Sequence, residues 1–149
     1  VVVRGKKVAG ILTEMSTDLD RIEFVVIGIG INVNTDSFPE EIREVATSLA
    51  IEQGKETART PIIAAVWKQF ARYEKLFEEK GSFTALKERY EALLANRGRE
   101  VRVLDPDGEY CGVAEGITEG GELLVRREDQ SLTAVRSGEV SVRGIYGYI

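Results

Sequence analysis

Residues 24–34 read FVVIGIGINVN, and this stretch decides how the N-terminal part of the chain folds. It is apolar along nearly its whole length, which is typical of a central strand that is covered on both faces. A helix is the competing interpretation, but Gly28 and Gly30 would each cost a helix about 1 kcal/mol relative to alanine. The stretch therefore predicts a strand at the centre of a sheet.

Toward the N-terminus, residues 1–3 and 8–12 are also β-prone, and the Arg-Gly-Lys-Lys sequence between them suits a hairpin turn. We expect the returning strand over residues 7–14. The polar residues 15–21 predict a second turn, which leads into the apolar strand.

The segment that follows the apolar strand contains a helix-start signal. Ser37, Pro39 and Glu40 have the spacing of a capping box, with the serine as N-cap and the glutamate at the third helical position. This spacing predicts a short helix that ends near Ala46.

Two amphipathic helices are predicted next, joined by a tight Gly-Ser turn at residues 81–82. Thr60 is the expected N-cap of the first, with Pro61 in its first position, and Ser82 is the expected N-cap of the second. Their apolar residues recur at three- and four-residue steps, which places them on one face of each helix. These residues are Ile62, Val66, Phe70, Tyr73 and Phe77 in the first helix, and Phe83, Leu86, Tyr90, Leu93 and Leu94 in the second.

The last third of the chain predicts strands and turns only. Turn sequences rich in Asp, Pro and Gly separate short stretches in which apolar and polar residues alternate. Five short strands in about fifty residues are typical of a small SH3-like barrel. The expected strands are residues 100–103, 110–117, 122–127, 132–135 and 140–143. The fold class is therefore α+β, with residues 1–96 as one domain and residues 97–149 as a second.

Composition excludes several classes of function. Of the 149 residues, 43% are hydrophobic and 30% are charged, which indicates a globular protein rather than a disordered one. The formal net charge of −5 argues against a broad nucleic-acid surface. The chain has no histidine, which excludes histidine-based catalytic triads and most zinc sites that contain histidine. We predict no metal site.

Cysteine usage and the chain start indicate the setting of the protein. Cys111 is the only cysteine, so there is no internal disulfide, and such usage is typical of the cytoplasm. The longest apolar run, residues 24–31, is far shorter than the ~20 residues of a membrane-spanning helix. The chain lacks an initiator methionine and opens inside a β-prone run, so we expect a fragment that starts within a domain.

The first candidate site is the lysine pair at the start of the returning strand. On a regular strand, Lys7 would share a face with Ala9 and Ile11, whereas Lys6 would point with Gly10. Either lysine is simply an exposed hairpin residue, or it is a fixed cation that holds an anionic ligand group. In the second case Gly10 lets the ligand approach the backbone.

The second candidate is the glycine-containing end of the apolar strand. It resembles a dinucleotide-binding fingerprint only superficially, because that motif must open a helix and here Val33 continues the strand. Gly28 and Gly30 mark either close packing of a helix or a flat ligand that lies on the strand. Asn32 offers both a donor and an acceptor, which suits the edge of an adenine.

The third candidate lies at residues 137–143, SGEVSVR. Glu139 and Arg143 are four residues apart on a predicted strand and therefore share one face. They form either a solvent-exposed pair of charges or part of a functional surface.

Taken together, these segments resemble the biotin–protein ligase family, which includes the biotin–[acetyl-CoA-carboxylase] ligases and biotin operon repressors. The resemblance rests on KKVAGILTE at 6–14, GIGINVN at 28–34, FPEEIREVATSL at 38–49 and SGEVS at 137–141, in the family's order. It covers essentially the whole chain. It implies part of a class II aminoacyl-tRNA-synthetase-like mixed sheet with flanking helices, followed by an SH3-like C-terminal domain.

The resemblance also implies an activity: biotin and ATP, the latter with Mg²⁺, are joined into biotinoyl-5′-AMP, and biotin then passes to a lysine of a carboxylase carrier domain. By resemblance, Lys7 contacts the biotin carboxylate and the phosphoanhydride and is the catalytic residue. The other matched positions are Gly10, Leu12, Gly28 and Ile31 in the biotin pocket, Asn32 at the adenine, and Glu139 and Arg143 at the ATP site and the carrier. No side-chain nucleophile is needed, so the missing histidine is compatible with this chemistry.

One departure from the family pattern matters. The glycine- and arginine-rich loop, roughly GRGRxGR, belongs upstream of Lys7 and is absent, so we expect residues 1–149 alone to be inactive. The helix-turn-helix of some members is also absent, so DNA is a partner only if the parent protein carries that domain. An open sheet edge could pair with a second copy of the chain to form a homodimer.

Two other functions compete with the ligase. A non-catalytic interaction module would recruit a partner protein through the small β-barrel of residues 98–149. A nucleotide-binding regulatory domain would use the glycine-containing strand without ligase chemistry and would bind ATP independently of biotin.

Overall fold

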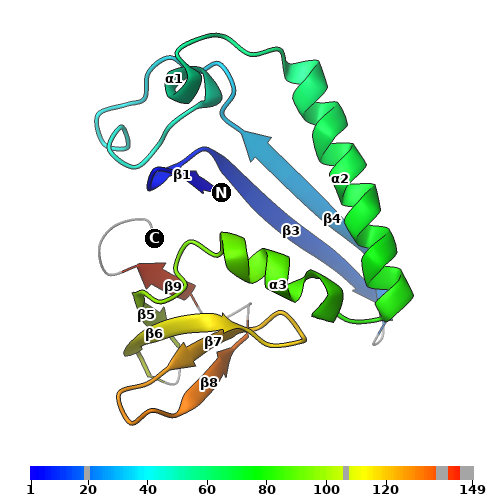
Figure 1. Cartoon of the computed structure of the whole chain (residues 1–149), viewed down its shortest axis with the longest axis vertical. Coiled ribbons are helices and arrows are strands. Elements are labelled where there is room, and N and C mark those ends of the chain that lie inside the picture. Colours follow the sequence, from blue (N-terminus) through cyan, green and yellow to red (C-terminus); the bar gives the residue numbers. More distant parts are fainter. Residues whose placement is uncertain (19–20, 106–107, 137–140, 145–149) are drawn as a thin grey trace. The chain divides into compact units, whose positions relative to one another are not determined.

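The computed structural model describes residues 1–18, 21–105, 108–136 and 141–144 (Figure 1). The chain divides into two compact units, Val1–Arg59 and Thr60–Ile149. Helices and antiparallel sheets occur together, which confirms the α+β fold class. In the described part of the chain, every helix is too short or too polar to cross a bilayer.

The first unit opens with a small hairpin. Strands β1 (Val2–Val3) and β2 (Lys6–Lys7) pair antiparallel, which confirms the predicted hairpin. The single returning strand predicted over residues 7–14 is wrong, because β2 ends at Lys7 and a separate strand begins at Ala9. The two turn residues both have positive φ, 50° at Arg4 and 80° at Gly5, which is the backbone that tight two-residue hairpins require. Arg4 therefore holds a conformation that L residues rarely adopt.

Strands β3 (Ala9–Asp18) and β4 (Arg21–Ile31) form a long two-stranded antiparallel ribbon, drawn in blue in Figure 1. The apolar stretch is thus a strand, as expected. The predicted turn at residues 15–21 is wrong, because cross-strand pairing continues to Asp18 and resumes at Arg21. The prediction of a strand covered on both faces is also wrong for the described residues: β4 pairs with β3 alone, and its side chains are largely exposed.

The helix of the first unit begins later than predicted. Residues 40–45 form turns, and the Ser37 hydroxyl bonds Asp36 instead of capping a helix. The helix is α1 (Leu49–Gln53), capped by Ser48, whose Oγ accepts from Ile51 N at 3.1 Å. The physical reason is that the backbone of residues 45–47 pairs with Lys7, which a helix through this segment would prevent.

The predicted pair of helices is present as α2 (Arg59–Lys80) and α3 (Thr84–Leu93). The expected N-cap at Thr60 is wrong, because α2 already begins at Arg59. Gly81 ends α2 with a left-handed φ of 63°. The expected N-cap serine is wrong by one residue, because Phe83 occupies the cap position of α3 and Ser82 bonds the Thr84 hydroxyl.

Five antiparallel strands complete the second unit, in the order β8-β7-β6-β5-β9. They are β5 (Glu100–Leu104), β6 (Tyr110–Ile117), β7 (Leu123–Arg126), β8 (Leu132–Val135) and β9 (Ser141–Gly144). All five predicted strands are confirmed, and the arrangement is consistent with the predicted SH3-like fold.

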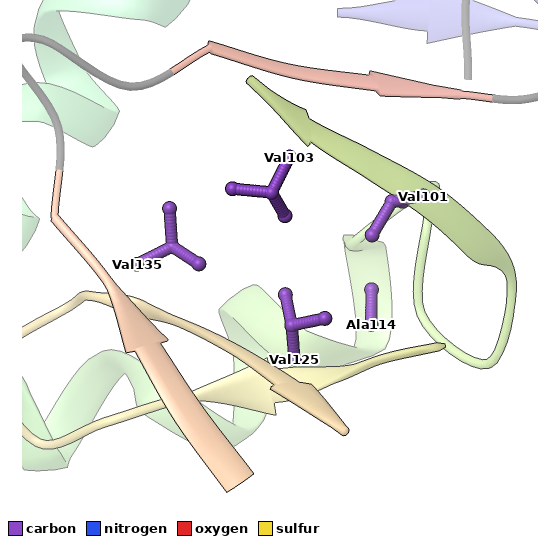
Figure 2. Packing of buried hydrophobic residues seen from close by; sticks show 5 residues of the cluster. All are labelled: Val101, Val103, Ala114, Val125 and Val135. Carbon is purple, nitrogen blue, oxygen red and sulfur yellow. The ribbon is translucent and has the colours of Figure 1, made fainter. Parts of the chain in front are cut away.

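The core of this sheet consists of small apolar side chains that point toward one another (Figure 2). Alternation along β5 buries Val101 and Val103 and leaves Arg102 between them exposed. The remaining members are Ala114, Val125 and Val135.

Candidate functional site

Lys7 ends strand β2 and is held through its backbone by the segment at residues 45–47. Its N–H donates to the Val45 carbonyl at 2.7 Å, and its carbonyl accepts from Thr47 N at 2.9 Å. A parallel bridge joins Lys7 to Ala46 between these bonds. The Lys7 side chain itself is exposed, so the backbone is fixed while the ammonium reaches the surface.

The Lys7 side chain lies over Gly10. A Cβ built on Gly10 would be 3.4 Å from Lys7 Cε and 3.5 Å from Lys7 Nζ. The expected face of Lys7, shared with Ala9, is therefore wrong. The cause is a local irregularity: Val8 N and Ala9 N both donate to the Val1 carbonyl, at 3.0 and 3.3 Å, which interrupts the strand alternation.

The face beneath the ammonium is a strip with very little side chain. Gly10 pairs with Gly30 and Leu12 pairs with Gly28 across the β3–β4 ribbon, and directly opposed residues share a face. We call Gly10, Gly28 and Gly30 the glycine strip. Within the described residues of this unit, a Cβ at Gly30 would meet nothing within 4 Å, and one at Gly28 would meet only Leu12 O at 3.7 Å. Close packing inside this unit therefore does not explain Gly28 or Gly30.

The predicted pocket residues divide between the two faces of the ribbon. Lys7, Gly10, Leu12 and Gly28 come together on the face of the glycine strip. Ile31 pairs with Ala9, and by strand alternation its side chain belongs to the opposite face.

Asn32 follows directly after β4 and is oriented by Thr47. Its Nδ2 donates to the Thr47 carbonyl at 3.1 Å, and its backbone N–H donates to Val8 O at 2.9 Å. Because a carbonyl can only accept, Nδ2 must face Thr47 and Oδ1 must face away. In the described part of the chain, Oδ1 has no hydrogen-bond donor, so the group that Asn32 presents is an acceptor.

Sequence reasoning missed a buried polar cluster beside these residues. Thr47 and Ser48 are 1% and 0% exposed, although both are polar. Thr47 Oγ1 donates to Glu52 Oε1 at 2.7 Å, and Glu52 Oε2 lies 3.2 Å from Arg4 Nη1. The available signal was the pair of hydroxyl residues placed between apolar neighbours in the segment ATSL at residues 46–49.

The remaining predicted site residues lie in or near β9. Arg143 pairs with Arg102 across β5 and β9, and Glu139 lies outside the described residues. The hydrogen bond from Arg102 to Glu109 raises the pKa of the Arg102 guanidinium above its ordinary value. Among the described residues, no cluster of acidic and cysteine side chains could hold a metal ion.

Comparison with known proteins gives concordant matches. Residues 98–143 match the family described as the biotin protein ligase C terminal domain. The chain is 36% identical over 87% of its length to the bifunctional ligase/repressor BirA of Bacillus spizizenii, and 28% identical over 85% to a biotin–[acetyl-CoA-carboxylase] ligase of Paracoccus denitrificans. It spans 40% and 53% of the lengths of these two relatives.

A solved structure matches at the level of the fold. The biotin protein ligase of Aquifex aeolicus in complex with biotin and ATP has a TM-score of 0.81 and 36% sequence identity with this chain. The match covers 95% of this chain and 58% of the Aquifex aeolicus chain.

Proposed function

We propose that this chain, which is similar in sequence and fold to biotin protein ligases, is the C-terminal part of an enzyme that activates biotin with ATP and attaches it to a protein lysine. The observation that carries the proposal is the Lys7 ammonium, which lies over Gly10 at the end of the glycine strip. Biotin is a largely apolar bicycle with one carboxylate. A bare strand face accepts the rings, and a lysine at its end holds the carboxylate.

The proposed reaction has two steps. A biotin carboxylate oxygen attacks the α-phosphorus of MgATP, the bond from that phosphorus to the bridging oxygen breaks, and pyrophosphate leaves. Negative charge accumulates at the phosphate in the transition state, where a preorganised cation stabilises it more than the ground state. The ε-amine of a carrier lysine then attacks the acyl carbon of biotinoyl-5′-AMP, AMP leaves, and the amine loses its proton to solvent.

In this proposal Lys7 is the catalytic residue, and Gly10, Leu12 and Gly28 form the floor and flank of the biotin pocket. Ile31 belongs to the opposite face and would reach the pocket only through its backbone. Its neighbour Asn32 presents an acceptor, which fits the exocyclic amino group of adenine.

The C-terminal domain has an accessory role in the proposal. We assign residues 1–96 to the catalytic domain and residues 97–149 to the SH3-like domain. Glu139 and Arg143 would help to close the ATP site and to present the biotin carboxyl carrier domain, which is the proposed protein substrate. The single cysteine, Cys111, suits a cytoplasmic enzyme.

Pyrophosphate release tests the proposal in the full-length protein that carries this chain. We expect release that requires both biotin and ATP, and we expect Lys7→Ala to reduce it by on the order of 100-fold or more, because removal of one preorganised charge contact typically costs that much. Lys6→Ala is the matched control, because the Lys6 Nζ bonds the Arg43 carbonyl at 3.1 Å, away from the strip.

Two results would contradict the proposal. Unchanged release by Lys7→Ala removes this residue from the active site. ATP binding without any biotin-dependent release favours the nucleotide-binding regulatory domain, and binding of neither ligand favours the interaction module.

A further inference from the structure

Thr47 touches both residues that we place against substrates. Its N–H donates to the Lys7 carbonyl at 2.9 Å, and its carbonyl accepts from Asn32 Nδ2 at 3.1 Å. Lys7 faces the carboxylate end of the proposed site and Asn32 faces the nucleotide end. The relative placement of these two ends therefore depends on where Thr47 is held.

The Thr47 side chain is anchored by a partly buried carboxylate, that of Glu52. Its Oγ1 donates to Glu52 Oε1 at 2.7 Å, and the Glu52 side chain is only 14% exposed. Glu52 Oε2 lies 3.2 Å from Nη1 of Arg4. Arg4 occupies the positive-φ turn of the hairpin that ends at Lys7, so the contacts form a closed loop from Lys7 through Thr47, Glu52 and Arg4 back to Lys7.

Placing the Glu52 carboxylate in this closed loop costs free energy. A carboxylate at this degree of burial loses hydration, and an apolar pair would pack the same space without that penalty. In contrast, the hydrogen bond from the Thr47 hydroxyl to a fixed carboxylate restricts the orientation of the Thr47 backbone. The Thr47 hydroxyl therefore fixes the backbone groups that hydrogen-bond to Lys7 and to the Asn32 side chain.

We propose that Thr47 and Glu52 are positioning residues for the adenylation step, a role that rests on the proposed function. Neither residue touches a substrate. They keep the Lys7 ammonium and Asn32 Oδ1 in the one arrangement that aligns the biotin carboxylate with the α-phosphate. Alignment matters most in the transition state, so its loss lowers kcat more than it raises KM.

The test measures biotin-dependent pyrophosphate release by the full-length protein. Thr47→Val keeps the shape but removes the donor, and we expect kcat to fall by about 10- to 100-fold, the usual effect of misplacing a catalytic group by about 1 Å. The KM values for biotin and ATP should change by less than about threefold. Thr47→Ser keeps the hydroxyl and should restore most of the activity. Thr17→Val, at an exposed position of β3, is the matched control.

A double-mutant cycle separates positioning from plain structural support. If Thr47 acts through Lys7, Thr47→Val should add little loss in single-turnover adenylate formation to a Lys7→Ala protein. Full additivity of the two losses overturns the proposal. If Thr47→Val does not fold, Glu52→Leu carries the same test, because leucine offers the Thr47 hydroxyl no acceptor, and the exposed Glu56→Leu is its control.

Different results would overturn the proposed function and the positioning role. A wild-type protein without biotin-dependent pyrophosphate release overturns the proposed function, and the positioning role with it. An active wild-type protein with unchanged kcat in both Thr47→Val and Glu52→Leu overturns the positioning role alone.

Discussion

At the scale of single residues, glycines in this chain serve two opposite purposes. Gly112 is required by packing, because a Cβ there would lie 2.6 Å from both Arg126 O and Val125 Cγ1. Gly28, in contrast, faces open space apart from Leu12 O at 3.7 Å. A glycine that packing within its unit does not require points to a ligand that must approach the backbone.

Gly28→Ala tests this distinction. The variant should melt at the same temperature as the wild type or slightly higher, because alanine is favoured over an unneeded glycine by about 0.5–1 kcal/mol. The KM for biotin should rise by about tenfold, because an added methyl group in a fitted site typically costs ~1–3 kcal/mol. Pyrophosphate release as a function of biotin concentration provides the measurement.

Gly112→Ala is the contrasting variant. It should lower the melting temperature, because neither the Arg126 backbone nor the buried Val125 side chain can move aside freely. An unchanged KM for biotin in Gly28→Ala would show that the glycine strip is not the binding face.

At the scale of elements, one acidic side chain joins α3 to the sheet of the second unit. Glu91 of α3 reaches over Gly116 and accepts from the buried Ile117 N–H at 2.9 Å. Its other oxygen lies 3.6 Å from Arg97 Nη2, and its side chain is only 14% exposed. Gly116 leaves the space that this contact occupies.

Glu91→Ala should reduce the free energy of unfolding by about 1–3 kcal/mol, because the Ile117 N–H would lose its acceptor in a buried place. Urea denaturation followed by circular dichroism measures the change. Glu88→Ala, at an exposed position of the same helix, should shift stability by less than about 0.5 kcal/mol. Equal effects of the two substitutions would show that Glu91 does not hold α3 to β6.

At the scale of the whole molecule, these residues cover only part of the relatives that they match. The chain spans 40% of the length of its Bacillus spizizenii relative. In the family that the sequence resembles, a glycine- and arginine-rich phosphate loop precedes the lysine. Within residues 1–149, Lys7 is the one residue that we propose to contact the phosphate.

We therefore expect residues 1–149 by themselves to leave a carrier domain unlabelled after incubation with biotin and MgATP, as read on a streptavidin blot. The full-length protein should label the same carrier domain. Circular dichroism of the short chain provides the folding control. Robust labelling by residues 1–149 would contradict this expectation and would make the upstream loop dispensable.

The sequence by itself determined the elements that depend on local patterns. The alternation around Val101 and Val103 and the turn residues between strands predict the C-terminal sheet, and the apolar spacing with Gly81 predicts the helical pair. Lys7 and Asn32 could be selected as candidates because a charge and an amide are unusual at the ends of apolar strands.

Tertiary structure decided what depends on contacts between distant residues. The pairing of Lys7 with Ala46 replaces the predicted helix by turns and delays α1 to Leu49. The shared Val1 carbonyl turns Lys7 onto Gly10, and the ion pair between Glu52 and Arg4 joins the segment around α1 to the hairpin. Local propensity specifies an element, but the direction of a side chain and the partner of a buried polar group are set by whichever distant backbone satisfies them.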